Sequence, residues 1–205
     1  EAEERLTVED MERIQLDDRN GLAPVLVPRL LDVLMPSEYL GAGQRLLKAV
    51  ALAVSGSRSA SVFDDLVRLL ATILHVEVAF IARHEAADPK SMRILAIYYD
   101  GQILRDIKYP IAGTPCETVL GHEFRAYPKH LQSLFPNDED ARAQGTESYA
   151  GHPLEALDGT PLGVVSVASR RVMAHVDRVE AMLKIFAMRA AAEIERLKAS
   201  EALRH

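Results

Sequence analysis

Cys116 is the only cysteine of the chain and lies in the segment GTPCETVLGHEF. Its side chain could act as a nucleophile, bind a metal, attach a cofactor or form part of the wall of a pocket. A catalytic thiolate needs a base within hydrogen-bond reach. His122 follows six positions later, but beyond Gly121, which we expect to end a short helix, and Glu117 opposes formation of the anion. Because a free cysteine is more often a small buried apolar residue, we predict no catalytic residue in this chain.

The histidines do not form a recognisable metal motif. There are seven, and neither HxxxH nor HExxH occurs among them. Cys116, His122, His130 and His152 could converge in space, but scattered histidines usually belong to the surface or the core. Phosphate-binding loops of the GxGxxG and GxxxxGK[ST] types are absent, as is the GxSxG nucleophile elbow. We therefore predict no metal site and no enzymatic activity, and the sequence leaves any cofactor unknown.

Charge and cysteine content exclude further classes of protein. Lys and Arg number 24 against 30 Asp and Glu, a net charge of −6, and no basic cluster is present, so we predict no nucleic-acid partner. A single cysteine cannot form an internal disulfide, which favours a cytoplasmic location. Apolar runs such as AVALAV fall far short of the roughly 20 residues of a membrane helix, so we predict no membrane partner. Because the chain begins with Glu1 rather than Met, we expect a piece of a larger protein.

Residue patterns divide the chain into three parts. Residues 1–42 predict a helical extension broken by prolines, 43–176 a core, and 177–205 a C-terminal helix. Asp100-Gly101 and Asp158-Gly159 are typical of hairpin turns. Within the core we predict helices at 43–54 and 61–74, the second opened by a Ser61–Asp64 capping pair, and strands at 76–83, 92–99, 102–107, 148–157 and 161–169. Helices followed by hairpin-connected strands indicate an α+β fold with a mostly antiparallel sheet.

The C-terminal helix carries an apolar seam with alternating steps of four and three residues, as in a coiled coil. Its members are Val179, Leu183, Phe186, Ala190, Ile194 and Leu197. We expect the first half of the helix to pack on the sheet. After Ala192 the apolar face narrows, which favours contact with a partner helix in a homodimer.

Three segments, GTPCETVL, FPNDEDA and SYAGHPLEALDGTPLGVVSV, together resemble in order and spacing a GAF domain of a bacterial signalling protein, over roughly residues 44–195. The resemblance implies a five- or six-stranded antiparallel sheet, with the terminal helices on one face and a roof of loops and a short helix over a pocket on the other. The final EIERLKASEALR resembles the coiled-coil linkers that join such domains to an output domain, for example a PAS, histidine kinase or diguanylate cyclase domain.

The same resemblance implies a set of candidate ligand-binding residues in the roof and the strands beneath it. They are Tyr98, Thr114, Cys116, Glu117, Phe135, Tyr149 and His152. Thr114 is a suitable N-cap for a short helix whose free N–H groups attract anions. Two alternatives stay open: Tyr149, Gly151 and Pro153 could simply build a β-bend, and His152 could face either the pocket or solvent.

Departures from the family pattern narrow the function. Glu117 follows Cys116, whereas bilin-binding members commonly have histidine at that position. The free methionine sulfoxide reductases of this fold need several cysteines, and this chain has one. The NKFDE set of residues found in cyclic-nucleotide-binding members is also absent. We therefore expect a non-catalytic sensory module of a signal transduction protein, such as a two-component system. It would bind a small molecule of unknown identity, relay the signal through a dimeric C-terminal helix, and act on an output domain in the same polypeptide. A ligand-free structural dimerisation domain is the alternative, and an enzyme using Cys116 or a metal is the least favoured hypothesis.

Overall fold

The computed structural model describes residues 62–85 and 87–203, all within the second of two compact units of the chain, Gly56–His205. The predicted extension at 1–42, the predicted helix at 43–54 and Ser61 lie outside the described residues.

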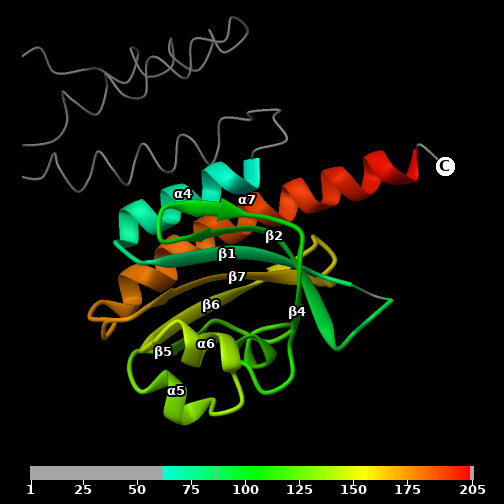
Figure 1. Ribbon diagram of the computed structural model, residues 1–205. Helices are drawn as coiled ribbons and strands as arrows, with labels where there is room; N and C mark the ends of the chain where they lie inside the picture. The colour runs from blue at the N-terminus through cyan, green and yellow to red at the C-terminus, as the bar shows by residue number, and fades with distance from the viewer. Residues whose placement is uncertain (1–61, 86, 204–205) are drawn as a thin grey trace, which may run out of the picture. The chain divides into compact units, whose positions relative to one another are not determined.

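The core of the fold is one antiparallel sheet with the order β3-β2-β1-β7-β6-β5, and β4 pairs with β2 off this path (Figure 1). The seven strands are β1 Val78–His84, β2 Ser91–Tyr99, β3 Gln102–Leu104, β4 Ile107–Pro110, β5 Arg125–Tyr127, β6 Ser148–Glu155 and β7 Pro161–Ser169. The antiparallel α+β fold is confirmed. The sheet has more strands than the expected five or six, because the predicted strand at 102–107 gives way to two short strands that share the outer edge of β2.

Two long helices cover one face of this sheet (Figure 1). Helix α4 (Val62–Leu74) packs over β1 and β2, and α7 (Val176–Ala202) packs over β6 and β7. The buried positions of α4 recur at helical spacing, as the sequence predicts. Asp64 is buried, and its carboxylate accepts a hydrogen bond of 2.8 Å from Nε of Arg105, which lies in the turn between β3 and β4. The capping pair predicted for Asp64 and Ser61 involves a residue outside the described part of the chain.

Helix α7 begins at Val176, one residue before the predicted start, and ends at Ala202, three residues before the predicted end. The first five members of its predicted seam are buried: Val179, Leu183, Phe186, Ala190 and Ile194. Leu197 is half-buried. The seam therefore lies inside the domain as far as Ile194, two residues beyond Ala192, where we expected the partner contact to begin.

Two tight backbone features fix the sheet. Asp100 and Gly101 both have positive φ and join Tyr99 to Gln102 in a two-residue hairpin, as predicted. Gly163, in β7, lies opposite Arg83 of β1, and a Cβ atom at this position would overlap the carbonyl oxygen of Ala82. Only glycine allows β7 to approach β1 this closely.

Replacement of Gly163 by alanine should therefore strongly destabilise the domain. The clash is with backbone, which cannot rotate away, and we expect a loss of about 3 kcal/mol in the free energy of unfolding. Gly159→Ala is the matched control, because its Cβ would meet nothing within 4 Å and only the positive φ of +83° is strained. It should cost about 1 kcal/mol. Chemical denaturation of both variants gives the comparison, and equal losses would contradict the close-approach argument.

Candidate functional site: a roofed cavity

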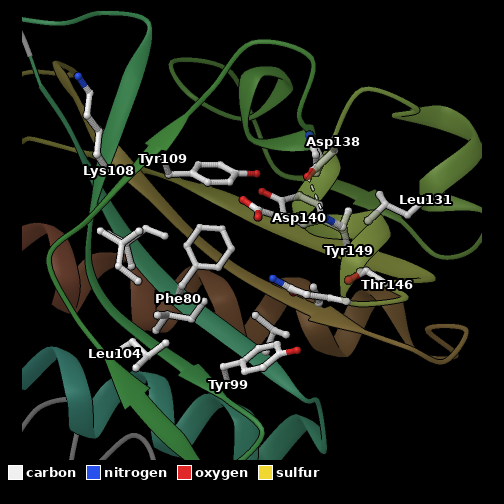
Figure 2. A pocket seen from close by; sticks show the side chains of 18 residues that line it. Phe80, Tyr99, Leu104, Lys108, Tyr109, Leu131, Asp138, Asp140, Thr146 and Tyr149 are labelled. Atoms are coloured by element: carbon white, nitrogen blue, oxygen red, sulfur yellow. Dashed lines mark hydrogen bonds between the residues drawn. The ribbon is translucent and has the colours of Figure 1, made fainter.

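A cavity of about 270 Å³ lies between the sheet and the roof, on the face that α4 and α7 leave free. Its floor is formed by strands β1, β2, β6 and β7, and one wall by β3 and β4 (Figure 2). The floor residues are Val78, Phe80, Ile94, Ile97, Tyr99, Tyr149 and Ala168, and the wall residues are Leu104, Ile107, Lys108 and Tyr109. A small apolar floor with a few polar groups above it is typical of a small-molecule site.

Three short helices and the loops between them make the roof. They are the 3₁₀ helix η2 (Pro115–Thr118), α5 (Leu131–Leu134) and α6 (Glu139–Ala143). Asp138 caps α6, since its carboxylate accepts a hydrogen bond of 2.9 Å from the backbone N–H of Ala141. The predicted segment FPNDEDA thus ends in a helix that faces the cavity with Asp140 and Ala141.

The roof is joined to the sheet by a buried polar chain. Sγ of Cys116 lies 3.3 Å from the hydroxyl oxygen of Tyr149, which lies 2.7 Å from Oγ of Ser166. Gly151 leaves room for this arrangement, because a Cβ there would overlap the Tyr149 hydroxyl and lie 3.0 Å from Oγ of Ser166. Cys116 therefore fastens η2 to β6 and β7.

The same burial makes Cys116 a poor nucleophile. Its thiol is fully buried, and burial raises its pKa to about 12. Burial also raises the pKa of the Tyr149 hydroxyl well above its usual value. A thiolate would thus be unfavourable here at neutral pH, which removes the physical basis of the enzyme hypothesis that used Cys116.

Acidic and phenolic groups face each other under the roof. Figure 2 shows the Tyr109 hydroxyl turned toward Asp138, and the carboxylate of Asp140 turned into the cavity. Burial raises the pKa of Asp138, the charge of Asp140 adds to the rise, and the hydrogen bond from Ala141 opposes it. Burial is also the main cause of the raised pKa of Tyr109.

The cation that lines the cavity is already paired. Nζ of Lys108 lies 2.7 Å from Oδ2 of Asp88, and Figure 2 shows its side chain pointing away from the roof carboxylates. Nearby Leu104 and Ile107 are 44% and 39% exposed, so the mouth of the cavity is apolar.

Arg170 holds one end of this arrangement together. Its Nη2 lies 2.6 Å from Oδ2 of Asp100, and its Nε donates to the backbone carbonyl of Gln144 over 2.9 Å. Its guanidinium carbon also lies 5.9 Å from the ring centroid of Tyr99. Two residues that line the cavity, Tyr99 and Gln144, are thereby linked to the end of β7, just before α7.

Of the seven predicted site residues, the structure places Tyr149 in the cavity lining. Thr114 and Cys116 are buried behind that lining. Thr114 does not cap η2 with its side chain, because its hydroxyl donates instead to the carbonyl of Ile111 over 2.7 Å. Glu117 is exposed and accepts a hydrogen bond of 2.8 Å from the backbone N–H of Gly113.

The other three predicted residues lie away from the cavity. The ring of Phe135 packs edge-on against Tyr127, with 4.8 Å between centroids. Alternation along β6 places His152 on the face opposite Tyr149, beside Phe124. Tyr98 also faces the helices, because β2 carries an extra residue opposite the junction of Ile81 and Ala82 that turns Tyr99 toward the cavity.

Sequence reasoning missed four aromatic and acidic lining residues, which come from the floor strand β2, from the wall strand β4, and from α6 and its N-cap. They are Tyr99, Tyr109, Asp138 and Asp140. The segment NDED contains a signal that could have indicated Asp138, because Asp before a short polar helix is a preferred N-cap. Nothing local indicated that this helix faces Tyr109, which is far from it in the sequence.

Among residues 62–85 and 87–203, no group of three or more His, Cys, Asp or Glu side chains is arranged to hold a metal ion. Likewise, none of the helices in this part of the chain has the length and apolarity needed to cross a bilayer.

Comparison with solved structures identifies the fold. The GAF domain of a phosphoenolpyruvate-protein phosphotransferase from Acinetobacter superposes with a TM-score of 0.63 at 14% identity, covering 82% of this chain and 99% of that one. The nlh2 GAF domain of A. aeolicus, in an inactive state, gives 0.55 at 16% identity, covering 78% and 98%. No protein-family model and no curated protein matches the sequence. The chain therefore has the fold of GAF domains, as its motifs indicated.

A bacteriophytochrome domain also shares this fold. The chromophore-binding domain of a bacteriophytochrome from R. palustris superposes with a TM-score of 0.61 at 14% identity. The match covers 82% of this chain but only 64% of that domain, slightly less than two thirds of its length.

The burial of Cys116 predicts very slow thiol labelling. A disulfide reagent at about pH 8 should modify the native protein about a thousandfold more slowly than the denatured protein, since reaction requires opening of the roof. Glu117→Cys is the matched control, because it places a second thiol on the exposed neighbouring residue and should add one rapidly labelled site. Rapid stoichiometric labelling of the unmodified chain would contradict the structure.

Proposed function

We propose that this domain is a non-catalytic, cytoplasmic sensory module that binds a small molecule in the roofed cavity and passes the signal along α7. The observation that carries the proposal is the cavity itself: an apolar floor on a rigid sheet, covered by short helices and loops. Loops can rearrange around a ligand at lower cost than a sheet can, because fewer buried contacts are broken.

The path from the cavity to α7 supports the relay. Arg170 contacts Tyr99 and Gln144, and it immediately follows β7. The next segment is also tied to the roof side of the sheet, because the N–H of Met173 donates to the carbonyl of Pro128 over 2.9 Å. A change at the cavity would therefore reach the start of α7 through few contacts.

A homodimer through α7 is the second part of the proposal. With the predicted seam buried as far as Ile194, we assign the contact to a second row of positions at the same four-and-three spacing. These are Ala181, Ile185, Met188 and Ala192, followed at the same spacing by the charged Glu195 and then by Ala199. Met188 is 72% exposed, which is unusual for a large apolar side chain on a helix. The helix would then join an output domain in the same polypeptide, as in multidomain signalling proteins.

A ligand-free structural dimerisation domain is the second candidate function. It is favoured by the volume of the cavity, which at about 270 Å³ lies slightly below the usual range of about 300–1,000 Å³ for ligand sites. The structural domain and the sensor differ in one measurable respect, which is whether a small molecule binds in the cavity.

The sensor function predicts a non-covalent adduct of low mass on the purified protein in native mass spectrometry, absent under denaturing conditions. Ala168→Leu should abolish the adduct, because the added carbons would fill the cavity from β7. Ala87→Leu, the same change at an exposed position between β1 and β2 that does not line the cavity, should retain it. An empty native protein would favour the structural domain, and an adduct that survives Ala168→Leu would exclude this cavity as the binding site.

If the exposed row of α7 forms the dimer interface, a charged residue placed in that row should weaken dimerisation. Met188→Lys should shift the monomer–dimer equilibrium toward monomer by about tenfold or more, since a charge would be buried in the interface. Val172→Lys is the control, because this residue is also apolar and 60% exposed but precedes the helix. Sedimentation equilibrium measures both, and an unchanged equilibrium for Met188→Lys would contradict the dimer through this row.

A further inference from the structure

The cavity combines an aromatic lining with acidic groups that have no cationic partner. Phe80, Tyr99 and Tyr109 supply three aromatic rings, and the centroids of Phe80 and Tyr109 are 6.2 Å apart. Figure 2 shows these rings on the floor and wall, with the carboxylates of Asp138 and Asp140 above them. Aromatic faces are negative and attract cations placed over them.

The charges around the cavity do not cancel. Within the described ranges, neither Asp138 nor Asp140 forms an ion pair with a Lys, Arg or His side chain. Lys108 is paired with Asp88, and the guanidinium of Arg142, on the same short helix, donates to the carbonyl of Pro136. Two carboxylates thus stand together at the roof of a site with an apolar floor.

Such a roof discriminates between ligands by charge. The buried carboxylate of Asp138 repels an anion and stabilises a cation, because screening by water is reduced around it. The carboxylate of Asp140 lies at the exposed edge of the cavity and adds its charge with more screening by water. The raised pKa of Asp138 has the same origin, since burial and the charge of Asp140 both disfavour a second negative charge. A cation bound beside these carboxylates would relieve this repulsion.

From this arrangement we infer that the ligand is a small organic amine, with an apolar or aromatic body on the floor and its ammonium group between Asp140 and the aromatic rings. The inference rests on the proposed sensor function and specifies the ligand class of the same site. The volume of about 270 Å³ corresponds to about nine water molecules, which limits the ligand to a single ring or a short chain. The apolar mouth at Leu104 and Ile107 would admit the body of such a molecule.

The test compares three probes that share one aromatic ring and differ in terminal group: 2-phenylethylamine, 2-phenylethanol and phenylacetate. Isothermal titration of the full 205-residue chain at neutral pH should show the amine binding about tenfold more tightly than the alcohol. Phenylacetate should bind more weakly than either. The alcohol isolates the contribution of the positive charge, because its body is the same.

Variants that each remove one negative charge from α6 show which carboxylate binds the ammonium group. Asp140→Asn should reduce amine affinity about tenfold and leave the affinity for the alcohol unchanged. Glu139→Gln removes the same charge from the adjacent exposed residue, which does not line the cavity, and should bind like the unmodified chain.

Each other outcome overturns the inference in a distinguishable way. Equal or tighter binding of the alcohol or of phenylacetate would refute the amine class and leave a small-molecule sensor standing. Amine binding that is equally weakened by Glu139→Gln would reflect only the general negative charge of α6. If no probe binds, the amine class is refuted, and whether the cavity binds any ligand is decided separately by the adduct and its response to Ala168→Leu.

Discussion

The arrangement of the site depends on one buried contact, that of the Tyr149 hydroxyl with Sγ of Cys116 and Oγ of Ser166. A phenol at this depth must be hydrogen-bonded, since an unsatisfied buried hydroxyl costs about 1–3 kcal/mol. The hydroxyl has one partner from the roof, Cys116, and one from the sheet, Ser166. This contact therefore sets the distance of η2 from β6 and β7. The cavity beside it then has a fixed floor and one anchored edge. At the other edge, α6 is held by its own cap, by the buried side chain of Ala141 and by the bond from Arg170 to the carbonyl of Gln144.

Much of the fold could be predicted because its signals are local. The hairpin at Asp100-Gly101 requires only two residues with positive φ, and the stripe of α4 and the seam of α7 are readable from spacing alone. The seam also gave a wrong expectation of where contact with a partner helix begins. Spacing alone does not distinguish a heptad row that packs on a sheet from one that packs on a partner helix. Ile194 is the instance: it fits a coiled coil equally well, and it is buried within the domain.

The site was less predictable, because it is made by convergence of distant segments. Tyr109 and Asp138 meet across the cavity although 29 positions separate their numbers in the sequence. Tyr98 and Tyr99 are adjacent and identical in type, and a single extra residue in β2 decides which of them faces the cavity. No pattern in the sequence marks that extra residue, because Leu95 is as typical of a regular strand as its neighbours are.

The length of α7 adds a mechanical consequence. A helix of 27 residues is about 40 Å long, so that a tilt of about 5° at its first turn displaces its far end by about 3 Å. Arg170 precedes the start of α7 by a few residues. Its side chain contacts the hairpin through Asp100 and the roof through Gln144. Under the proposed relay, an angstrom-scale rearrangement around the cavity would be amplified with distance along the helix. Arg170 would then set the angle at which the helix leaves the domain, although its exposure limits its contribution to stability.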